Sequence, residues 1–375
     1  MLTTETLHRD FPTLEGIAYL NTAAESVPPV CVTQAVSDYM HHKRMGMRGR
    51  DHHFPRVEQC REVTARLLGL DPGEVGFCSC SSEAYNLLST ALGLTAQDHV
   101  VISDLDFPSG ATPWLTARDK PQVQLWQSRQ GALHLEYLTP LLTDKTRLVQ
   151  LSLVSFYNGY RLAWNEAAAL VRQHAPQAIL SADITQAFGR VDVRGLDADI
   201  FISSTHKWTL GIHGGGIVGI PRRNDARLTT AAGGWYHLRN AFDADRFQRA
   251  DVKPGAASYS VGMPSFAALY ALNAALRYVE ATGISAIEAH ANPLVTQAYD
   301  GLIALGFTPM APLDQTQRPT GIIAFQHADS ARLHTALEAA DVHVMHSAGR
   351  IRIAVHGYNT ADDIQRLLAT LAAAK

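Results

Sequence analysis

The 375-residue sequence predicts an α/β protein with a mainly parallel central sheet, helices on both faces and a smaller α+β domain at the C-terminal end. From about residue 56 to 220, helical patterns alternate with short β-rich runs, which is typical of a parallel sheet covered by helices. After Pro254 and Gly255, long helical patterns replace this alternation. A chain of this length is expected to form more than one domain.

The first part of the chain supplies the elements of the sheet. We expect helices over residues 57–69, 82–92 and 165–174, and strands over 75–78, 100–103, 123–126, 148–153, 178–182, 200–203 and 216–220. The apolar runs 179–180 and 200–202 indicate strands that are buried on both faces.

The second part of the chain predicts a compact α+β unit. We expect helices over residues 264–282, 285–304, 329–340 and 361–373, and strands over 320–326 and 350–355. Thr360 followed by Asp363 resembles a capping box at the start of the last helix. These patterns predict an N-terminal segment over 1–18, a large domain over 19–255 and a small domain over 256–375.

Composition and charge exclude several classes of protein. The sequence is 46% apolar and 18% charged, close to globular averages, so it can bury a sizeable core. A net charge of −3 argues against nucleic acid or an anionic membrane as the principal partner. No apolar stretch is long enough to cross a bilayer, and residues 1–11 do not resemble a signal peptide. We therefore expect a cytoplasmic protein.

The four cysteines predict neither a disulfide framework nor a metal site. Cys31, Cys60, Cys78 and Cys80 are too few for a disulfide-stabilised chain of this size. Cys78 and Cys80 lack a second Cys/His pair that could complete a zinc site. We interpret them as small buried side chains.

The strongest chemical signal lies between Ala182 and Gly219. Asp183 follows one predicted strand, and the run Ser204-Thr205-His206-Lys207 follows another. Because the carboxyl ends of parallel strands line the ligand crevice of an open sheet, these side chains should converge there. Lys207 follows a buried strand, where loss of solvation would lower its pKa and make the amine nucleophilic.

This segment resembles the signature of fold-type I enzymes that depend on pyridoxal 5′-phosphate (PLP), in the class V aminotransferase group of cysteine desulfurases and kynureninases. The resemblance extends from residues 19–24 to 358–360. It implies the PLP-transferase fold, with PLP joined to Lys207 as a Schiff base. It also implies that the enzyme acts on a small amino acid by removing its Cα proton. It also implies that Asp183 pairs with the pyridine nitrogen, that His206 assists at the site, and that the protein is a homodimer with sites near the interface.

The resemblance implies a phosphate site with two parts. Ser81 and Ser82 begin a predicted helix, where free backbone N–H groups and the helix dipole attract anions. Ser204 and His206, beside the lysine, would complete this site.

Three further residues receive roles from the resemblance. Gln186 would donate a hydrogen bond to the ring oxygen O3′, and Phe107 would cover the ring as in kynureninase-like members. Arg352 matches the arginine that binds the substrate α-carboxylate, for which its planar fork is suited. A core phenylalanine and a surface strand arginine are the alternative interpretations of Phe107 and Arg352.

One departure from the family bears on the reaction. Cysteine desulfurases carry a nucleophilic cysteine on the loop before the arginine, and the corresponding stretch 342–349 has none. We expect a C–S or related β-lyase that lacks a persulfide cysteine. A class V aminotransferase, an amino-acid epimerase and a non-catalytic binding protein remain open alternatives.

Other candidate residues have two interpretations each. Trp235, Tyr236, His237, Arg239 and His346 could recognise substrate or could pack at an interface.

In the segment over residues 253–258, family members send a loop into the partner's site. Ala256 stands here where a threonine is usual, and Ser258 could replace it.

The run from His213 to Gly216 resembles a lipase oxyanion motif, but the chain has no Gly-x-Ser-x-Gly elbow. We expect close backbone packing there instead.

Overall fold

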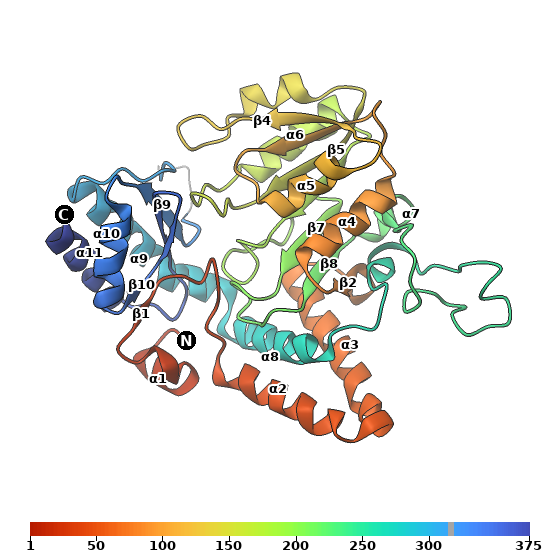
Figure 1. Ribbon diagram of the computed structural model, residues 1–375, viewed down its shortest axis with the longest axis horizontal. Helices are drawn as coiled ribbons and strands as arrows, with labels where there is room; N and C mark the ends of the chain where they lie inside the picture. The colour runs from red at the N-terminus through yellow and green to blue at the C-terminus, as the bar shows by residue number, and fades with distance from the viewer. Residues whose placement is uncertain (314–318) are drawn as a thin grey trace.

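The computed structural model describes residues 1–313 and 319–375. A large body contains a seven-stranded sheet, and a smaller body contains the C-terminal helices and a three-stranded sheet (Figure 1). The large sheet has the order β2-β8-β7-β6-β5-β3-β4. Its strands are β2 (Val75–Cys78), β3 (His99–Ser103), β4 (Gln122–Trp126), β5 (Thr146–Ser152), β6 (Ile179–Asp183), β7 (Ile200–Ser204) and β8 (Gly216–Gly219).

The central sheet is mainly parallel, which confirms the predicted fold class. Strands β4, β3, β5, β6 and β7 run parallel to their neighbours, and only β8 pairs antiparallel, with β2 and β7. The carboxyl ends of β5, β6 and β7 therefore lie at one edge of the sheet. This edge is where the sequence predicts a ligand site.

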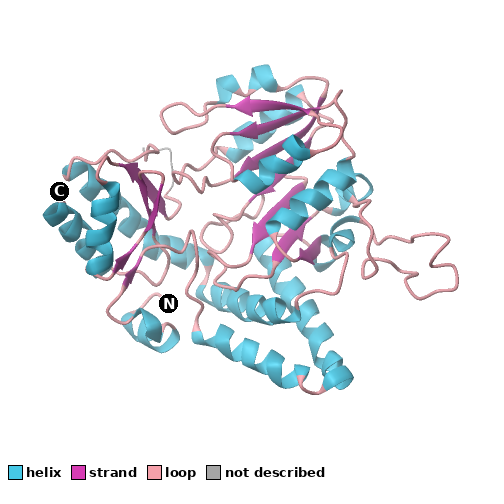
Figure 2. Cartoon of the chain, viewed as in Figure 1, coloured by secondary structure: helices cyan, strands magenta, loops and turns pink. Residues whose placement is uncertain are grey.

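Helices cover both faces of this sheet (Figure 2). Leu180 and Phe201 share a core with buried residues of α3, α6 and α8, whereas Ile179 and Ile202 share one with α4 and α5. Successive strand residues thus point to opposite cores, as the doubly apolar runs predict. The helices of the large body are α2 (Val30–Lys43), α3 (Arg50–Leu68), α4 (Ser81–Leu92), α5 (Pro108–Thr116), α6 (Trp164–His174), α7 (Asp225–Leu228) and α8 (Phe266–Thr282).

The smaller body is an antiparallel sheet covered by helices. Its strand order is β11-β12-β9, and its elements are α9 (Ile284–Ala304), β9 (Ile322–Gln326), α10 (Ser330–Ala339), β11 (Met345–Ser347), β12 (Arg350–Ala354) and α11 (Ala361–Ala374). The side chain of Thr360 accepts a hydrogen bond from the Asp363 N–H, and Asp363 accepts one from the Thr360 N–H. The predicted capping box is confirmed.

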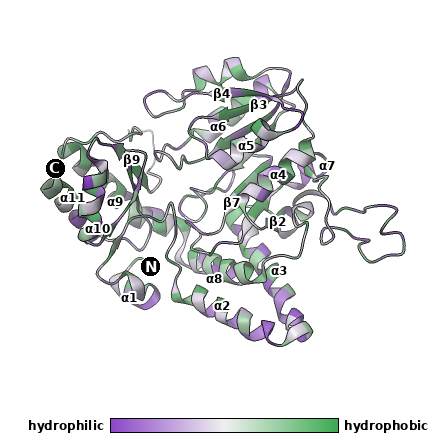
Figure 3. Ribbon diagram, viewed as in Figure 1, coloured by the Kyte–Doolittle hydropathy of each residue, from purple (hydrophilic) through white to green (hydrophobic). Residues whose placement is uncertain are grey.

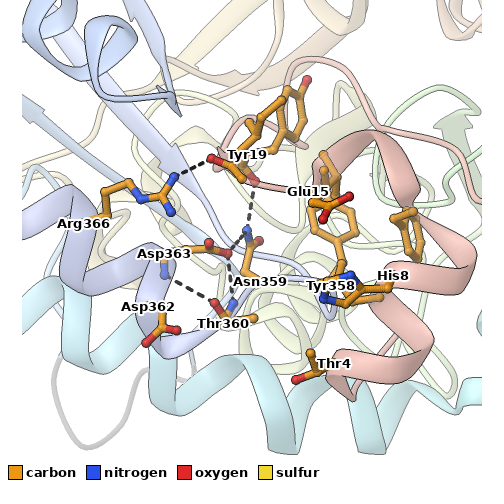
Figure 4. Close-up of a pocket in the computed structure, with 15 residues that line it drawn as sticks. Thr4, His8, Glu15, Tyr19, Tyr358, Asn359, Thr360, Asp362, Asp363 and Arg366 are labelled. Carbon is orange, nitrogen blue, oxygen red and sulfur yellow. Dashed lines mark hydrogen bonds between the residues drawn. The ribbon is translucent and has the colours of Figure 1, made fainter.

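The N-terminal segment packs against both bodies. Helix α1 (Thr4–Asp10) precedes β1 (Ala18–Tyr19), which pairs in parallel with β10 (Val342–His343). A cavity of about 210 Å³ separates α1 from the start of α11, as Figure 4 shows. At its edge, Asn359 donates a hydrogen bond to the Tyr19 oxygen and Arg366 donates one to the Gly16 oxygen. The division at residues 18 and 255 stays a proposal; β1 pairs with a strand of the small body, and α8, beyond residue 255, packs in the core of the large body.

Several helices begin earlier than the sequence indicates. Helix α3 starts at Arg50 rather than residue 57 and continues through Pro55, although that proline lacks a backbone donor. Helices α1, α2 and α5 were not expected. Short 3₁₀ turns cover Pro12–Leu14, Gly46–Gly49, Pro72–Glu74, Leu135–Tyr137, Thr139–Leu141, Arg222–Asn224 and Gly255–Tyr259.

Hydrophobic residues are concentrated along the central strands and α8, whereas the turn between α2 and α3 is hydrophilic (Figure 3). None of the helices in the described part of the chain is both long and apolar enough to span a bilayer.

Candidate active site

A cavity of about 200 Å³ opens at the carboxyl ends of β5, β6 and β7, beside the first residues of α4 and α5. All eight side chains that the sequence assigns to cofactor binding line it, namely Ser81, Ser82, Phe107, Asp183, Gln186, Ser204, His206 and Lys207. Six further residues also line it, namely Cys80, Ser109, Ser152, Val154, Phe156 and Thr185. The structure thus brings the predicted residues together, and their chemical roles remain a proposal.

Lys207 lies three residues beyond the end of β7 and points into this cavity. Its Nζ is 5.3 Å from the centre of the Phe107 ring. Burial lowers the pKa of the Lys207 amine to about 8, although the negative charge of Asp183 partly opposes the shift. Near neutral pH a much larger fraction of this amine is therefore neutral and nucleophilic than of an ordinary lysine.

Asp183 is the last residue of β6 and is almost completely buried. Its Oδ1 accepts a 2.8 Å hydrogen bond from the backbone N–H of Thr185, which fixes the carboxylate at the edge of the sheet. Tyr85, on the buried face of α4, lies behind it: burial and then the charge of Asp183 raise the pKa of the Tyr85 hydroxyl. Sequence reasoning missed Tyr85 because it has the spacing of an ordinary core residue.

His206 stacks on His213, with ring centres 4.0 Å apart. The Nε2 atom of His213 lies 2.7 Å from a carboxylate oxygen of Glu25, which holds the outer ring in place. Burial, followed by the charges of His213 and Lys207, lowers the pKa of His206 to about 4. His206 is therefore a neutral, flat side chain at physiological pH.

The glycines after His213 pack tightly against neighbouring backbone. A Cβ atom at Gly216 would overlap Cys80, and one at Gly215 would overlap the side chain of Thr205. The expected explanation for this glycine run, close packing after the lysine loop, is confirmed.

Gln186 has a fixed amide orientation. The indole Nε1 of Trp208 donates a 2.7 Å hydrogen bond to Gln186 Oε1, and Gln186 Nε2 donates a 3.1 Å bond to the backbone oxygen of Ala23. An amide nitrogen carries two hydrogens, so Gln186 retains one donor for a ligand in the cavity.

The proposed phosphate site combines a helix start with a buried hydroxyl. Ser81 and Ser82 are the first two residues of α4, and no side chain caps this helix. Ser204 Oγ is buried and has no hydrogen-bond partner in the described part of the chain. A helix start with free N–H groups and an unsatisfied hydroxyl suits a phosphate.

The cysteine interpretation needs a correction. Cys80 is exposed and Cys78 is half-buried, so they are not both buried side chains. Cys80 is the residue before α4 and lies in extended backbone, which places it at the rim of the cavity. Within residues 1–313 and 319–375, no three His, Cys, Asp or Glu side chains are arranged to hold a metal ion.

Arg352 is carried by β12 of the small domain and is 2% exposed. Its Nη1 donates a 2.8 Å hydrogen bond to the backbone oxygen of Phe156, a residue that lines the cavity. The rings of Phe156 and Phe107 meet edge to face, with centres 4.9 Å apart. Phe107 is 42% exposed and lines the cavity, so it is not a core phenylalanine.

Several candidate residues lie elsewhere. His346 stacks on His334 of α10 and contacts Ser330 Oγ at 3.1 Å, on the side of the small sheet away from the cavity. Trp235, Tyr236, His237 and Arg239 do not line the cavity. They begin the segment between α7 and α8, which projects from the body of the molecule (Figure 1).

The segment expected to reach a partner's phosphate is buried in its own chain. Ala256 is 1% exposed. The Ser258 hydroxyl donates to the Gly255 oxygen and accepts from the Thr230 N–H. Both side chains are therefore packed inside their own chain.

The sequence profile described as Aminotransferase class-V matches residues 18–367. The chain belongs to the class V aminotransferase family. The expected membership of this PLP-dependent group is confirmed.

Curated relatives of this class V protein cover nearly its whole length. It is 27% identical to an "Uncharacterized aminotransferase YcbU" of Bacillus subtilis (strain 168), over 97% of this chain and 96% of the relative. It is 28% identical to a "Cysteine desulfurase" of Dickeya dadantii (strain 3937), over 96% of this chain and 94% of the relative.

Solved structures show the same fold. An apo cysteine desulfurase from Thermococcus onnurineus NA1 superposes with a TM-score of 0.88 at 21% identity, covering 100% of this chain and 98% of that one. The cystine C–S lyase C-DES, in complex with its product cysteine persulfide, also gives a TM-score of 0.88, at 20% identity, with 96% and 99% covered.

The residues of the cavity fit PLP. The cofactor needs an amine to hold its aldehyde, an acid for its ring nitrogen and anion-binding groups for its phosphate. Lys207, Asp183 and the start of α4 would supply these three functions along one cavity. The unsatisfied Ser204 hydroxyl would gain a hydrogen-bond partner from a phosphate bound there.

Proposed function

We propose that this class V aminotransferase family member is a PLP-dependent enzyme that removes the Cα proton of a small amino acid and cleaves a C–S or related β bond. The observation that carries the proposal is the amine of Lys207, with its pKa lowered to about 8, in one cavity with the buried carboxylate of Asp183. We further propose that it works as a cytoplasmic homodimer with sites near the interface.

When bound, PLP supplies an electron sink for the negative charge that develops at Cα. Asp183 holds a negative charge beside the ring nitrogen and thereby keeps that nitrogen protonated. Gln186 directs its remaining amide hydrogen toward the ring oxygen, and the start of α4 binds the phosphate.

Lys207 has two tasks in this proposal. Its neutral amine would hold the cofactor, and in the presence of substrate the same amine would be placed to accept and return the proton at Cα. The guanidinium of Arg352 binds the α-carboxylate and so orients the Cα–H bond. Phe107 and Phe156 form an apolar wall that excludes water from the cavity.

The choice of a lyase rests on the position of the cysteines. The stretch over residues 342–349, before Arg352, contains none, and Cys80 lies at the start of α4 in the proposed phosphate site. We therefore propose that the enzyme uses no persulfide relay from that loop. The names of the cysteine desulfurase relatives and of the C–S lyase C-DES support β-bond cleavage.

A class V aminotransferase is the second candidate, supported by the name of the Bacillus subtilis relative. An epimerase uses the same first step and remains an alternative. A non-catalytic binding protein would retain the cofactor but would turn over no amino acid.

Two experiments test the proposal. Borohydride reduction of the holoenzyme, followed by peptide mapping, is expected to place the cofactor on Lys207; an unlabelled Lys207 would refute the assignment. Incubation with a panel of amino acids, with pyruvate, sulfide and amino-group transfer assayed in parallel, then separates the reactions. Pyruvate formation with release of the sulfur product is expected, whereas amino-group transfer alone would favour the aminotransferase.

A further inference from the structure

Two arginines lie on the same face of the small sheet. Residues on β12 alternate between its faces, and Ile351 and Ile353 point into the core of the small domain. Ala354 packs instead in the core of the large domain, and Arg352 bonds to Phe156 of that domain. Arg350 shares this second face, so both guanidinium groups point toward the large domain.

Both guanidinium groups are buried, and each has donor atoms without an acceptor. Arg350 is 4% exposed and Arg352 is 2% exposed. The Nε and Nη1 atoms of Arg350 and the Nε atom of Arg352 have no hydrogen-bond acceptor in the part of the chain that the structure describes. Buried donors are normally satisfied, and buried charges are normally paired, so two such groups side by side indicate missing anions.

The positive charge of Arg350 raises the electrostatic cost of burying Arg352. Burial, followed by the positive charge of Arg350, lowers the pKa of Arg352 to about 10. Burial lowers the pKa of Arg350 as well, although Tyr157 partly opposes this shift. A single carboxylate on Arg352 would satisfy that side chain and leave the donors of Arg350 without an acceptor.

Arg350 lies next to Phe156, a residue of the cavity wall, although Arg350 itself does not line the cavity. Its guanidinium carbon is 4.1 Å from the centre of the Tyr157 ring and 5.9 Å from that of Phe156, which lines the cavity. Phe156 in turn contacts Phe107, whose ring lies 5.3 Å from the Lys207 amine. A ligand that extends from Lys207 past Arg352 would therefore approach Arg350.

We propose that the substrate is an amino acid with a second acid group, which Arg350 binds while Arg352 binds the α-carboxylate. This inference rests on the proposed function, because it requires an amino acid in the Lys207 cavity. For a C–S lyase, the substrate would be a cysteine derivative whose sulfur substituent or side chain carries the second acid. Arg350 is then the residue that determines specificity for dianionic over monoanionic amino acids.

Binding of unreactive acids to the holoenzyme tests this proposal without turnover. Malonate, succinate and glutarate are titrated against acetate at constant ionic strength, with calorimetry and the visible absorbance of the cofactor as readouts. For the best dicarboxylate we expect binding at least about tenfold tighter than acetate, the factor for one charge-assisted hydrogen bond. Arg350→Gln should abolish this preference and keep acetate affinity, whereas Arg352→Gln should weaken both.

The controls separate specificity from structure. Arg332→Gln removes an exposed arginine of α10 and should change neither affinity. If Arg350→Gln destabilises the fold, Arg350→Lys keeps the charge but not the fork and should show reduced preference. Unchanged preference with a lower Tm would mean that Arg350 only stacks on Tyr157, which overturns the inference. Labelling of Lys207 by borohydride is independent of Arg350, so its failure refutes the proposed function instead.

Discussion

Arg352 donates a 2.8 Å hydrogen bond from Nη1 to the backbone oxygen of Phe156. The first residue belongs to the small domain and the second lines the cavity of the large domain. The same guanidinium is proposed to bind the substrate α-carboxylate, so substrate affinity depends on how the two domains meet.

Replacement of Arg352 by Ala is expected to raise KM for amino acids. The increase should correspond to a loss of about 2–4 kcal/mol in binding free energy, because a charge pair shielded from water is lost. Steady-state kinetics with the best substrate of the panel measures it. The exposed Arg332→Ala variant serves as the control. If KM stays at the wild-type value, Arg352 does not bind the carboxylate.

Replacement of Lys207 by Ala should abolish turnover and the reducible link to the cofactor, because no other amine lines the cavity. Mass spectrometry after borohydride reduction measures the link directly. Lys253→Ala is the matched control, since Lys253 donates its hydrogen bond to the Tyr236 oxygen outside the cavity. A cofactor adduct that persists in Lys207→Ala would contradict the assignment.

Replacement of Asp183 by Asn should lower turnover by at least about 10²-fold, the usual loss when one preorganised electrostatic group is removed. The amide keeps the shape of the side chain but cannot keep the ring nitrogen protonated. Cofactor content should remain, and the absorbance spectrum reports it. Asp192→Asn, at an exposed ion pair with Arg194, should behave as wild type; wild-type activity in Asp183→Asn would refute the role.

The rate of PLP attachment to the cofactor-free protein should depend on pH with a midpoint near 8. The folded pKa of Lys207 is lowered to about 8 from 10.5, so the proton leaves the native amine at lower pH than in an ordinary lysine. Below this midpoint the rate should rise about tenfold per pH unit, and above it the rate should level off. Stopped-flow absorbance measures it, and a rise that continues to about pH 10 would contradict the lowered pKa.

The lowered pKa of Lys207 also predicts how the stability of the cofactor-free protein depends on pH. Between pH 8 and 10.5 the unfolded state binds more protons at Lys207 than the native state, so stability contributed by this group increases with pH in that window. Lys207→Met should remove this part of the pH dependence of the free energy of unfolding, as measured by denaturant titration.

Replacement of Gly159 by Ala should destabilise the protein more than replacement of Gly195. Both glycines have positive φ values, +84° and +75°, so each substitution costs roughly 1–2 kcal/mol in backbone strain. At Gly159 the new Cβ would also overlap the backbone oxygen of Ile322, whereas at Gly195 it meets open space. Thermal unfolding measures the difference; equal Tm values would contradict the packing at this turn.

The central part of the site could be predicted from sequence because it follows strand ends. Asp183 is the last residue of one buried strand, and Lys207 lies a short turn beyond the end of the next strand. Parallel pairing of the two strands therefore brings these residues together. The sequence pattern of each strand is strong because both faces are buried. This is why the fold class and the cavity are predictable from local pattern.

Other features depend on tertiary packing that the sequence does not display. His346 points away from the cavity because the register of β11 and β12 places it opposite Ile351, on the core face. Arg350 shares the strand face of Arg352, but nothing in the sequence shows that both are buried without acceptors. Cys80 is exposed because α4 begins at the cavity rim, which no local pattern predicts.

The pairing of β1 with β10 has a consequence for biosynthesis. Residues 18–19 emerge from the ribosome before their partner strand, 342–343, because the whole large domain is encoded between them. The small domain therefore cannot complete its fold until the large domain has been synthesised, and a fragment that begins after the large domain would lack a strand. Addition of a peptide that contains the first 24 residues should restore cooperative unfolding to such a fragment.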